Sequence, residues 1–231
     1  MGGNIVANNL KDNFLNALKS TYKAYNIYGA RSPKKLVAIH SWFAKEIIAG
    51  LDKSYSVKSL GNDGEYEIKG KYYPKTVDIT IFSSQKPILT MSFKFVTSNY
   101  AQNSNNYFEN LLGETANIRR TGIGFVHFLV LRGYAPYYDK AGGNKRGKLK
   151  KIETLSEHQI KKYVELFKDL DFPHRPDILG IAVVDFNDSA EPYFTDLTKL
   201  GLKEDTIKML QSDFSVETFI EKVRALCQLK K

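Results

Sequence analysis

Apolar residues recur every three or four positions in several segments of the chain, which is the spacing of helices with one buried face. This spacing predicts helices over residues 10–25, 32–51 and 108–118. Ser32 precedes a proline, a combination that is typical of a helix start. Two further helices are expected to begin at Ser156 and Ser215, because each hydroxyl is followed by Gln or Glu within the first turn.

Other segments have the patterns of β-strands. Residues 77–81 and 89–95 alternate between apolar and polar side chains, so each predicts a strand with one polar face, and residues 83–87 between them predict a turn. Residues 123–131 and 178–184 are almost entirely apolar, as expected for strands that are buried on both faces. Within residues 55–71, short strand-like stretches flank a turn-forming Gly-Asn-Asp-Gly sequence, which predicts a hairpin.

These elements predict an α/β fold with a mixed central β-sheet flanked by helices. The chain has 231 residues, a length that a single domain can reach, and no long linker divides it. We therefore expect one domain over residues 1–231.

Composition narrows the classes of partner. The formal net charge is +9 at pH 7, and such a field attracts polyanions, so nucleic acid is the first partner to consider. No apolar run approaches the roughly 20 residues needed to span a bilayer, and the start of the chain lacks the features of a secretory signal. We expect a cytoplasmic protein without membrane partners. No phosphate-binding glycine loop follows a predicted strand, so no nucleotide cofactor is expected.

The polar faces of the two alternating strands carry the candidate chemistry. Alternation places Asp78 on the polar face of one strand and both Ser92 and Lys94 on the polar face of the next. If the strands pair, the Asp78 carboxylate lies close to the Lys94 ammonium. A carboxylate can hold Mg²⁺ against a phosphate oxygen, and an adjacent lysine can stabilise developing charge or help to activate water. A structural ion pair on a solvated sheet face is the alternative.

The sequence Pro74-Lys-Thr-Val-Asp78, followed after thirteen residues by Ser92-Phe-Lys94, resembles the PD-(D/E)xK motif of restriction-endonuclease-like nucleases. Ser92 stands where that family usually has Asp or Glu, and Val rather than Pro precedes Asp78. One branch of type II restriction endonucleases is similar in this respect, with a Glu from the next helix in place of the middle acid. The resemblance implies Mg²⁺-dependent hydrolysis of DNA that leaves 5′-phosphate and 3′-hydroxyl ends.

The resemblance also implies which groups hold the metal. Glu109, on the helix that follows Lys94, is the expected replacement for the middle acid. Glu114 is the competing candidate, because five residues rotate a helical side chain by about 140° and only one of the two can face the site. The implied Mg²⁺ ligands are Asp78, Glu109 and the carbonyl oxygen of Phe93.

Other acidic residues are weaker candidates. Glu46, on the second predicted helix, matches a catalytic Glu that often precedes the central strands in this superfamily, and an ion pair with a nearby Lys is the alternative. Glu65 and Glu67 come shortly before Asp78 in the chain, and they are either ligands or ordinary surface charges.

Amide and basic side chains suggest where DNA would bind. Residues 98–107 are rich in Asn, whose amides can pair with adenine edges, although a turn of capping residues would have the same composition. Basic residues that could contact guanine or phosphate end the helix before residue 121 and fill a loop predicted over residues 139–151. The candidate DNA-binding residues are Asn99, Asn103, Asn105, Asn106, Arg119, Arg120, Lys145, Arg146 and Lys148.

These features together predict a sequence-specific type II restriction endonuclease that uses Mg²⁺ and acts on double-stranded DNA. A homodimer is expected, because a two-fold protein suits the cutting of two antiparallel strands at a symmetric site. One alternative is a repair or recombination nuclease of the same fold. The other is a non-catalytic DNA-binding protein, which Ser92 makes credible.

Overall fold

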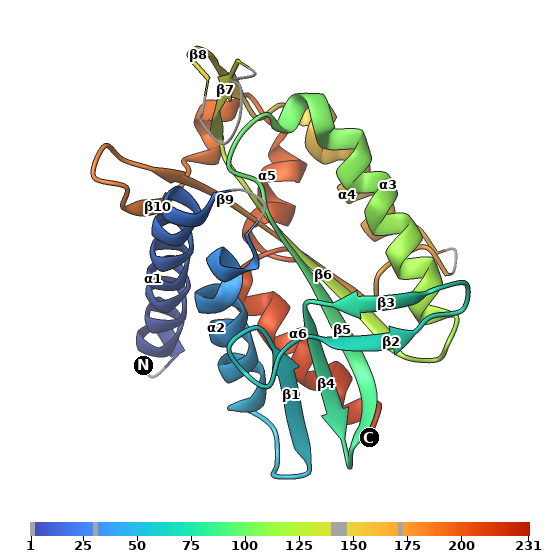
Figure 1. The fold of residues 1–231 in the computed structure, drawn as a ribbon. Helices are drawn as coiled ribbons and strands as arrows, with labels where there is room; N and C mark the ends of the chain where they lie inside the picture. Colours follow the sequence, from blue (N-terminus) through green and yellow to red (C-terminus); the bar gives the residue numbers. More distant parts are fainter. Residues whose placement is uncertain (1–2, 30–31, 140–146, 171–172) are drawn as a thin grey trace.

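A computed structural model of the protein describes residues 3–29, 32–139, 147–170 and 173–231 (Figure 1). The helices are α1 (Gly3–Tyr28), α2 (Val37–Ile48), α3 (Tyr100–Arg119), α4 (Glu157–Lys168), α5 (Glu204–Gln211) and α6 (Val216–Leu229), with short 3-10 helices η1 (Pro33–Leu36) and η2 (Leu197–Leu200). The strands are β1 (Tyr55–Ser59), β2 (Tyr66–Lys69), β3 (Pro74–Val77), β4 (Ile79–Ser83), β5 (Lys86–Phe95), β6 (Gly124–Leu131), β7 (Tyr134–Tyr138), β8 (Leu149–Thr154), β9 (Ile178–Phe186) and β10 (Pro192–Phe194).

The central sheet has six strands in the order β1-β4-β5-β6-β9-β10. β5 pairs with β6 and β6 pairs with β9 in parallel, whereas the other neighbours are antiparallel. Two further two-stranded sheets, β2-β3 and β7-β8, lie outside it. The expected α/β fold with a mixed central sheet flanked by helices is confirmed, and so are the strands expected near residues 89–95, 123–131 and 178–184.

Helices cover both faces of the central sheet (Figure 1). On one face, α1, α2 and α6 pack against the sheet through a group of aromatic rings that includes Phe43, Phe93, Phe128 and Phe219. On the other face, apolar residues of α3, α4 and α5 pack against β6 and β9. None of the helices in the described part of the chain has the length and apolar character that crossing a membrane requires.

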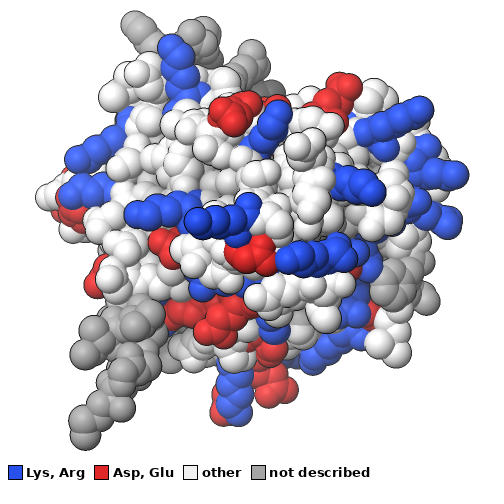
Figure 2. Space-filling view, turned by 90° about the horizontal axis from the view of Figure 1, so that it is seen from below, with Lys and Arg blue, Asp and Glu red and all other residues white. Residues whose placement is uncertain are grey.

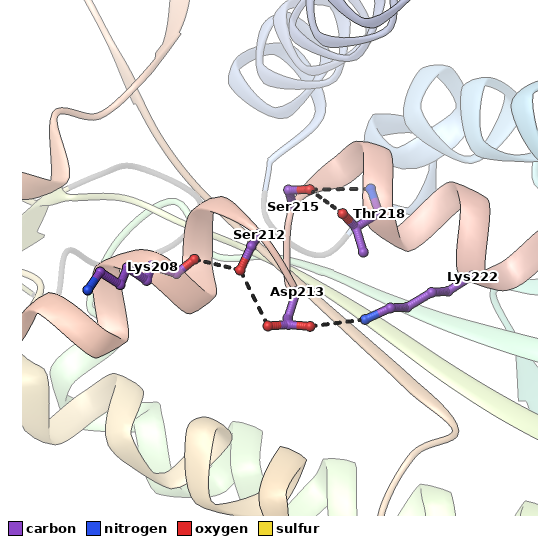
Figure 3. Close-up of polar contacts among 6 residues, drawn as sticks. All are labelled: Lys208, Ser212, Asp213, Ser215, Thr218 and Lys222. Atoms are coloured by element: carbon purple, nitrogen blue, oxygen red, sulfur yellow. Dashed lines mark hydrogen bonds and ion pairs between the residues drawn. The ribbon is translucent and has the colours of Figure 1, made fainter. Parts of the chain in front are cut away.

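The predicted helix starts at Ser156 and Ser215 are confirmed. Ser156 forms a capping box with the Gln three residues later. Ser215 accepts a hydrogen bond of 3.3 Å from the Thr218 amide at the beginning of α6 (Figure 3). Just before this cap, Asp213 accepts a hydrogen bond of 3.3 Å from Lys222, one of the contacts at the junction between α5 and α6.

The turn between β4 and β5 fixes how these two strands align. Ser84 and Gln85 have φ angles of 48° and 69°, the left-handed conformation that tight hairpins require. This confirms the turn expected at residues 83–87. The pairing shifts once, between Ile81 and Phe82, before the regular register continues.

The hairpin predicted within residues 55–71 is wrong. β1 pairs with β4 and β2 pairs with β3, so the two strands in this segment belong to different sheets. The residues between them do form a turn, with positive φ at Gly61 and Gly64. The physical reason is that each strand completes a different core: Tyr55 of β1 packs under α2 and α6, whereas Ile68 of β2 packs under α3.

The strand predicted over residues 77–81 is in fact divided at Asp78. Val77 ends β3 and Ile79 begins β4. The Asp78 carboxylate accepts a hydrogen bond of 2.7 Å from the backbone amide of Phe93. The side-chain oxygen of Asp78 therefore accepts a hydrogen bond that a backbone carbonyl accepts in a regular ladder. At this residue the chain leaves the β2-β3 sheet and enters the central sheet.

Two further boundaries differ from the sequence expectation. α3 begins at Tyr100, so most of the amide-rich residues 98–107 belong to the helix rather than to the segment before it. The loop expected over residues 139–151 is partly a strand, because β8 begins at Leu149 and pairs with β7. Lys145 and Arg146 lie outside the described residues.

Truncating the aromatic ring at the middle of the first core should strongly destabilise the protein. Phe128 is fully buried, and its ring centroid lies 5.1 Å from that of Phe43 and 4.8 Å from that of Phe219. Phe128→Ala should lower the free energy of unfolding by about 3–5 kcal/mol, as measured by urea denaturation. Tyr193, which is 46% exposed, provides the control, and Tyr193→Ala should change stability by less than about 0.5 kcal/mol. Similar losses in both variants would contradict this assignment of the core.

Candidate active site

Asp78 and Lys94 lie together, as the strand alternation predicted. The Nζ atom of Lys94 is 3.9 Å from the Oδ2 atom of Asp78. The same oxygen accepts the hydrogen bond from the Phe93 amide, which fixes the orientation of the carboxylate. The side chains of Asp78 and Lys94 are 20% and 33% exposed, so a large substrate can reach both groups from solvent.

Glu65 adds a second carboxylate to this site. β2 and β3 are antiparallel with Tyr66 opposite Val77, so Glu65, just before β2, and Asp78, just after β3, adjoin the same end of this two-stranded ladder. Burial and the negative charge of Asp78 raise the pKa of Glu65, against the effect of Lys94. Two carboxylates and one ammonium group therefore act on one another here.

A row of polar residues continues across the central sheet from Asp78. Asp78 accepts the hydrogen bond from the Phe93 amide, and Ser92, the residue before Phe93, pairs with His127 of β6. Ser92 and His127 are only 4% and 2% exposed. Within the described residues, neither the Ser92 hydroxyl nor Nδ1 of His127 has a hydrogen-bond partner. Buried polar atoms are nearly always paired, so these two atoms are exceptions. They leave the site with unused hydrogen-bonding capacity.

Two buried histidines near the site are held in the neutral form. Burial, helped by the positive charge of Lys94, lowers the pKa of His127 to about 3. Burial also lowers the pKa of His40, although the charge of Asp78 opposes the shift. The His40 ring packs on the Phe93 ring with centroids 5.7 Å apart. His127 lies within residues 123–131, which are predicted to be buried on both faces, but nothing in the sequence places His40 close to Asp78.

The two candidate carboxylates on α3 have different surroundings. Glu114 forms an ion pair of 2.8 Å with Lys75 of β3. Burial lowers the pKa of Lys75, but the hydrogen bond and charge of Glu114, together with the charges of Tyr73 and Asp78, outweigh burial and raise this pKa. Lys75 thus connects Glu114 to the site. Glu109 is exposed, and its negative charge acts on Lys162 of α4. The role of Glu109 as a metal ligand stays a prediction.

Glu46 is engaged with the last helix. Its Oε2 atom lies 3.8 Å from Nη2 of Arg224, and its carbonyl oxygen accepts hydrogen bonds from the same guanidinium. This arrangement is the ordinary ion-pair role that the sequence left open, with an arginine as partner rather than a lysine. A catalytic role for Glu46 stays a prediction.

Three of the candidate DNA-binding amides have partners within the protein. Asn99 has the left-handed conformation with φ 54°, and its side chain accepts a hydrogen bond of 3.4 Å from the Tyr138 amide. Asn103 donates a hydrogen bond of 3.1 Å to the carbonyl oxygen of Asn99. Asn105 accepts one of 3.0 Å from Lys162. These contacts favour the interpretation of the segment as a turn and helix start.

Among the basic candidates, too, one has a partner within the protein and others are exposed. Arg119 forms an ion pair of 2.8 Å with Asp177 and joins the end of α3 to the start of β9. Asn106, Arg120 and Lys148 are exposed, and their binding of DNA stays a prediction. Figure 2 shows Lys and Arg side chains spread over the face seen from below, with Asp and Glu between them. Positive charge on this face is therefore distributed rather than gathered in one stripe.

The oxygen donors at the site fit Mg²⁺. This ion is usually held by one or two carboxylates together with phosphate oxygens and water. Asp78 and Glu65 supply such a pair, and a divalent cation would relieve the repulsion that raises the pKa of Glu65. In the described ranges, no three or more His, Cys, Asp and Glu side chains are grouped to hold a metal ion, so substrate and solvent would complete its coordination.

The buried His127 should make stability sensitive to acid. Its folded-state pKa is about 3, below the unfolded value, so only the unfolded chain takes up this proton and stability falls as the pH drops from about 6.5 towards 3. His127→Asn should make this fall less steep by about 1.4 kcal/mol per pH unit in urea denaturation series. His158→Asn, at an exposed position of α4, should leave the slope unchanged. If His127→Asn leaves the dependence of stability on pH unaltered, the lowered pKa of His127 is refuted.

Comparison of the chain with protein-family models found no match, and comparisons with curated proteins and with solved structures found none either. Relatedness to a known protein therefore contributes nothing to the assignment of chemistry. The grounds for that assignment are the residues around Asp78 and Lys94 and their geometry.

Proposed function

We propose that the protein is a Mg²⁺-dependent endonuclease that hydrolyses phosphodiester bonds in DNA. The observation that supports this most is the approach of Lys94, on β5, to Asp78, between β3 and β4, at 3.9 Å. A phosphate group needs a cation to offset its charge and carboxylates to hold a metal ion beside it. Lys94, Asp78 and Glu65 supply both kinds of group in one exposed site.

Each side chain has a distinct role in this proposal. Lys94 donates hydrogen bonds to a non-bridging phosphate oxygen and stabilises the negative charge that grows there in the transition state. The Phe93 amide holds Asp78, and Glu65 completes the carboxylate pair. Mg²⁺, when bound, supplies further neutralisation of the phosphate charge. Water forms the new bond to phosphorus and gives up one proton to solvent, the bond to the 3′ oxygen breaks, and that oxygen takes a proton from solvent, which leaves 5′-phosphate and 3′-hydroxyl ends.

A type II restriction endonuclease that cuts double-stranded DNA as a homodimer is the first biological candidate, carried forward from the motif resemblance. A repair or recombination nuclease with the same chemistry is the second. Exposed rings favour the second candidate: Tyr72 and Tyr73, at the end of the β2-β3 hairpin, are 67% and 47% exposed, and such rings can stack on unpaired bases. Digestion of unmethylated phage DNA separates the two, because discrete fragments require sequence recognition.

Removing either member of the Asp78–Lys94 pair should abolish cleavage without abolishing DNA binding. Asp78→Asn and Lys94→Gln preserve side-chain size but remove the charge, and each should lower the rate of plasmid cleavage in Mg²⁺ by at least about 100-fold. Gel electrophoresis measures the cleavage and a mobility shift measures the binding. Glu165→Gln, at an exposed carboxylate of α4, is the matched control and should cut at the wild-type rate. Wild-type protein that binds DNA but never cuts it would be a non-catalytic DNA-binding protein.

Variants of Glu65 and Glu109 should identify the second carboxylate. Glu65→Gln should raise the Mg²⁺ concentration for half-maximal cleavage by about 10–100-fold, because a group that supports the metal is lost. Glu67→Gln changes an exposed carboxylate two residues further along the chain, in β2, and should have no such effect. If Glu109→Gln shifts the Mg²⁺ requirement and Glu65→Gln does not, the carboxylate on α3 is the ligand and the place given to Glu65 is wrong.

A further inference from the structure

The end of the β2-β3 hairpin presents rings and ammonium groups that the proposed mechanism does not use. We define the hairpin end as residues 69–75. Tyr72 and Tyr73 are 67% and 47% exposed, and both Lys69 and Lys71 are exposed beside them. The segment contains no acidic residue. Aromatic rings contribute most to stability when they are buried in a core or an interface. Two exposed tyrosines between lysines therefore indicate a binding surface.

A buried side chain holds the backbone of the hairpin end in place. Asn117 of α3 is fully buried, and its amide oxygen accepts hydrogen bonds of 2.9 and 3.3 Å from the amides of Tyr72 and Tyr73. Its amide nitrogen donates a bond of 3.0 Å to the Tyr73 carbonyl, and its own carbonyl accepts one of 2.9 Å from Lys71. A Cβ at position 70 would lie 2.2 Å from this side chain, so Gly70 permits the close approach. The rings are thus presented from a preorganised backbone, which lowers the entropy cost of binding.

The hairpin end lies close to the active site. Lys75, which belongs to the hairpin end, is near enough to Asp78 for the charge of this carboxylate to contribute to the raised pKa of the lysine. Successive residues of a strand face opposite ways, so Lys69 of β2 lies on the face opposite to the buried Ile68. From Tyr73 to Asp78 the extended chain spans roughly 17 Å. That length corresponds to about five nucleotide steps of a DNA strand. A strand held at the active site can therefore reach the hairpin end.

We propose that the hairpin end binds DNA that has unpaired bases, with Lys69 and Lys71 at phosphates and with Tyr72 and Tyr73 stacked on bases. The inference rests on the proposed function for one premise, that the substrate is DNA. Lysines attract the phosphates of any nucleic acid, but rings need open base faces, and an intact duplex hides these within its own stack. The substrate class assigned here is DNA with a single-stranded segment close to the bond that is cut.

Binding measured without Mg²⁺ tests the inference separately from cleavage. The full chain is titrated, in the presence of EDTA, into a fluorescent single-stranded oligonucleotide and into the same oligonucleotide annealed to its complement, and anisotropy reports the affinity. The double variant Tyr72→Ala, Tyr73→Ala should weaken single-strand binding by roughly 30-fold or more and change duplex binding little. The double variant Lys69→Gln, Lys71→Gln should weaken both and reduce the salt dependence.

Matched controls lie on a different part of the protein. Tyr193→Ala removes an exposed ring of β10, and Lys199→Gln with Lys203→Gln removes two exposed lysines near α5. None of these should change either affinity. Equal losses for single-stranded and duplex DNA in the tyrosine variant, or no loss at all, would overturn the inference. A urea unfolding midpoint for each variant identifies any loss that comes from a damaged fold.

The outcomes also separate this inference from the proposed function. Protein that binds single-stranded DNA through the hairpin end, but cuts no DNA in Mg²⁺, would leave the inference standing and remove the nuclease proposal. If the protein cuts DNA, but the tyrosine variant binds single strands as tightly as the wild type does, then only the inference fails.

Discussion

The hydrogen bond from the Phe93 amide to the Asp78 carboxylate is the contact on which the rest of the site depends. It marks the residue at which the chain leaves the β2-β3 sheet and enters the central sheet. It also aligns β4 with β5, so that Lys94 lies beside Asp78 while the Phe93 ring packs into the core with Phe43. Hydrogen bonds to a charged acceptor are stronger than neutral ones. One such bond therefore joins the aromatic core to the polar site.

The parts of the fold that could be predicted are those whose burial is visible locally in the sequence. The alternation around Lys94 and the unbroken apolar runs of β6 and β9 predict strands, because each pattern records which faces are covered. The partner of β1 could not be predicted in this way. Its pairing with β4 depends on which of two cores Tyr55 completes, and that is decided in part by α6, at the other end of the chain, where the Cys227 carbonyl accepts a hydrogen bond from the Tyr55 hydroxyl.

The candidate site was predictable to a similar extent. The proximity of Asp78 and Lys94 follows from two neighbouring alternating strands, and the structure has it. The division of the strand at Asp78 was not predictable, because it depends on an amide of another strand. The nearness of Glu65 to Asp78 depends on the pairing of β2 with β3, which brings the start of one strand and the end of the other together. The Asn117 contacts with the hairpin end link residues 44 and 45 positions apart, and no periodicity signals such bonds.

The turn at Ser84 and Gln85 has a consequence for how this chain can vary in nature. Two left-handed residues close the hairpin, and from Ile81 to Ile79, next to Asp78, the pairing with β5 is then regular. Adding or removing one residue between the turn and Lys94 would shift the register of β5 by one residue and turn each side chain to the other face. A phenylalanine would then lie beside Asp78, and the lysine charge would be buried in the aromatic core. The number of residues between Asp78 and Lys94 is thus as much a part of the site as the side chains. Sequences that descend from this one should change residues in this interval more readily than they change its length.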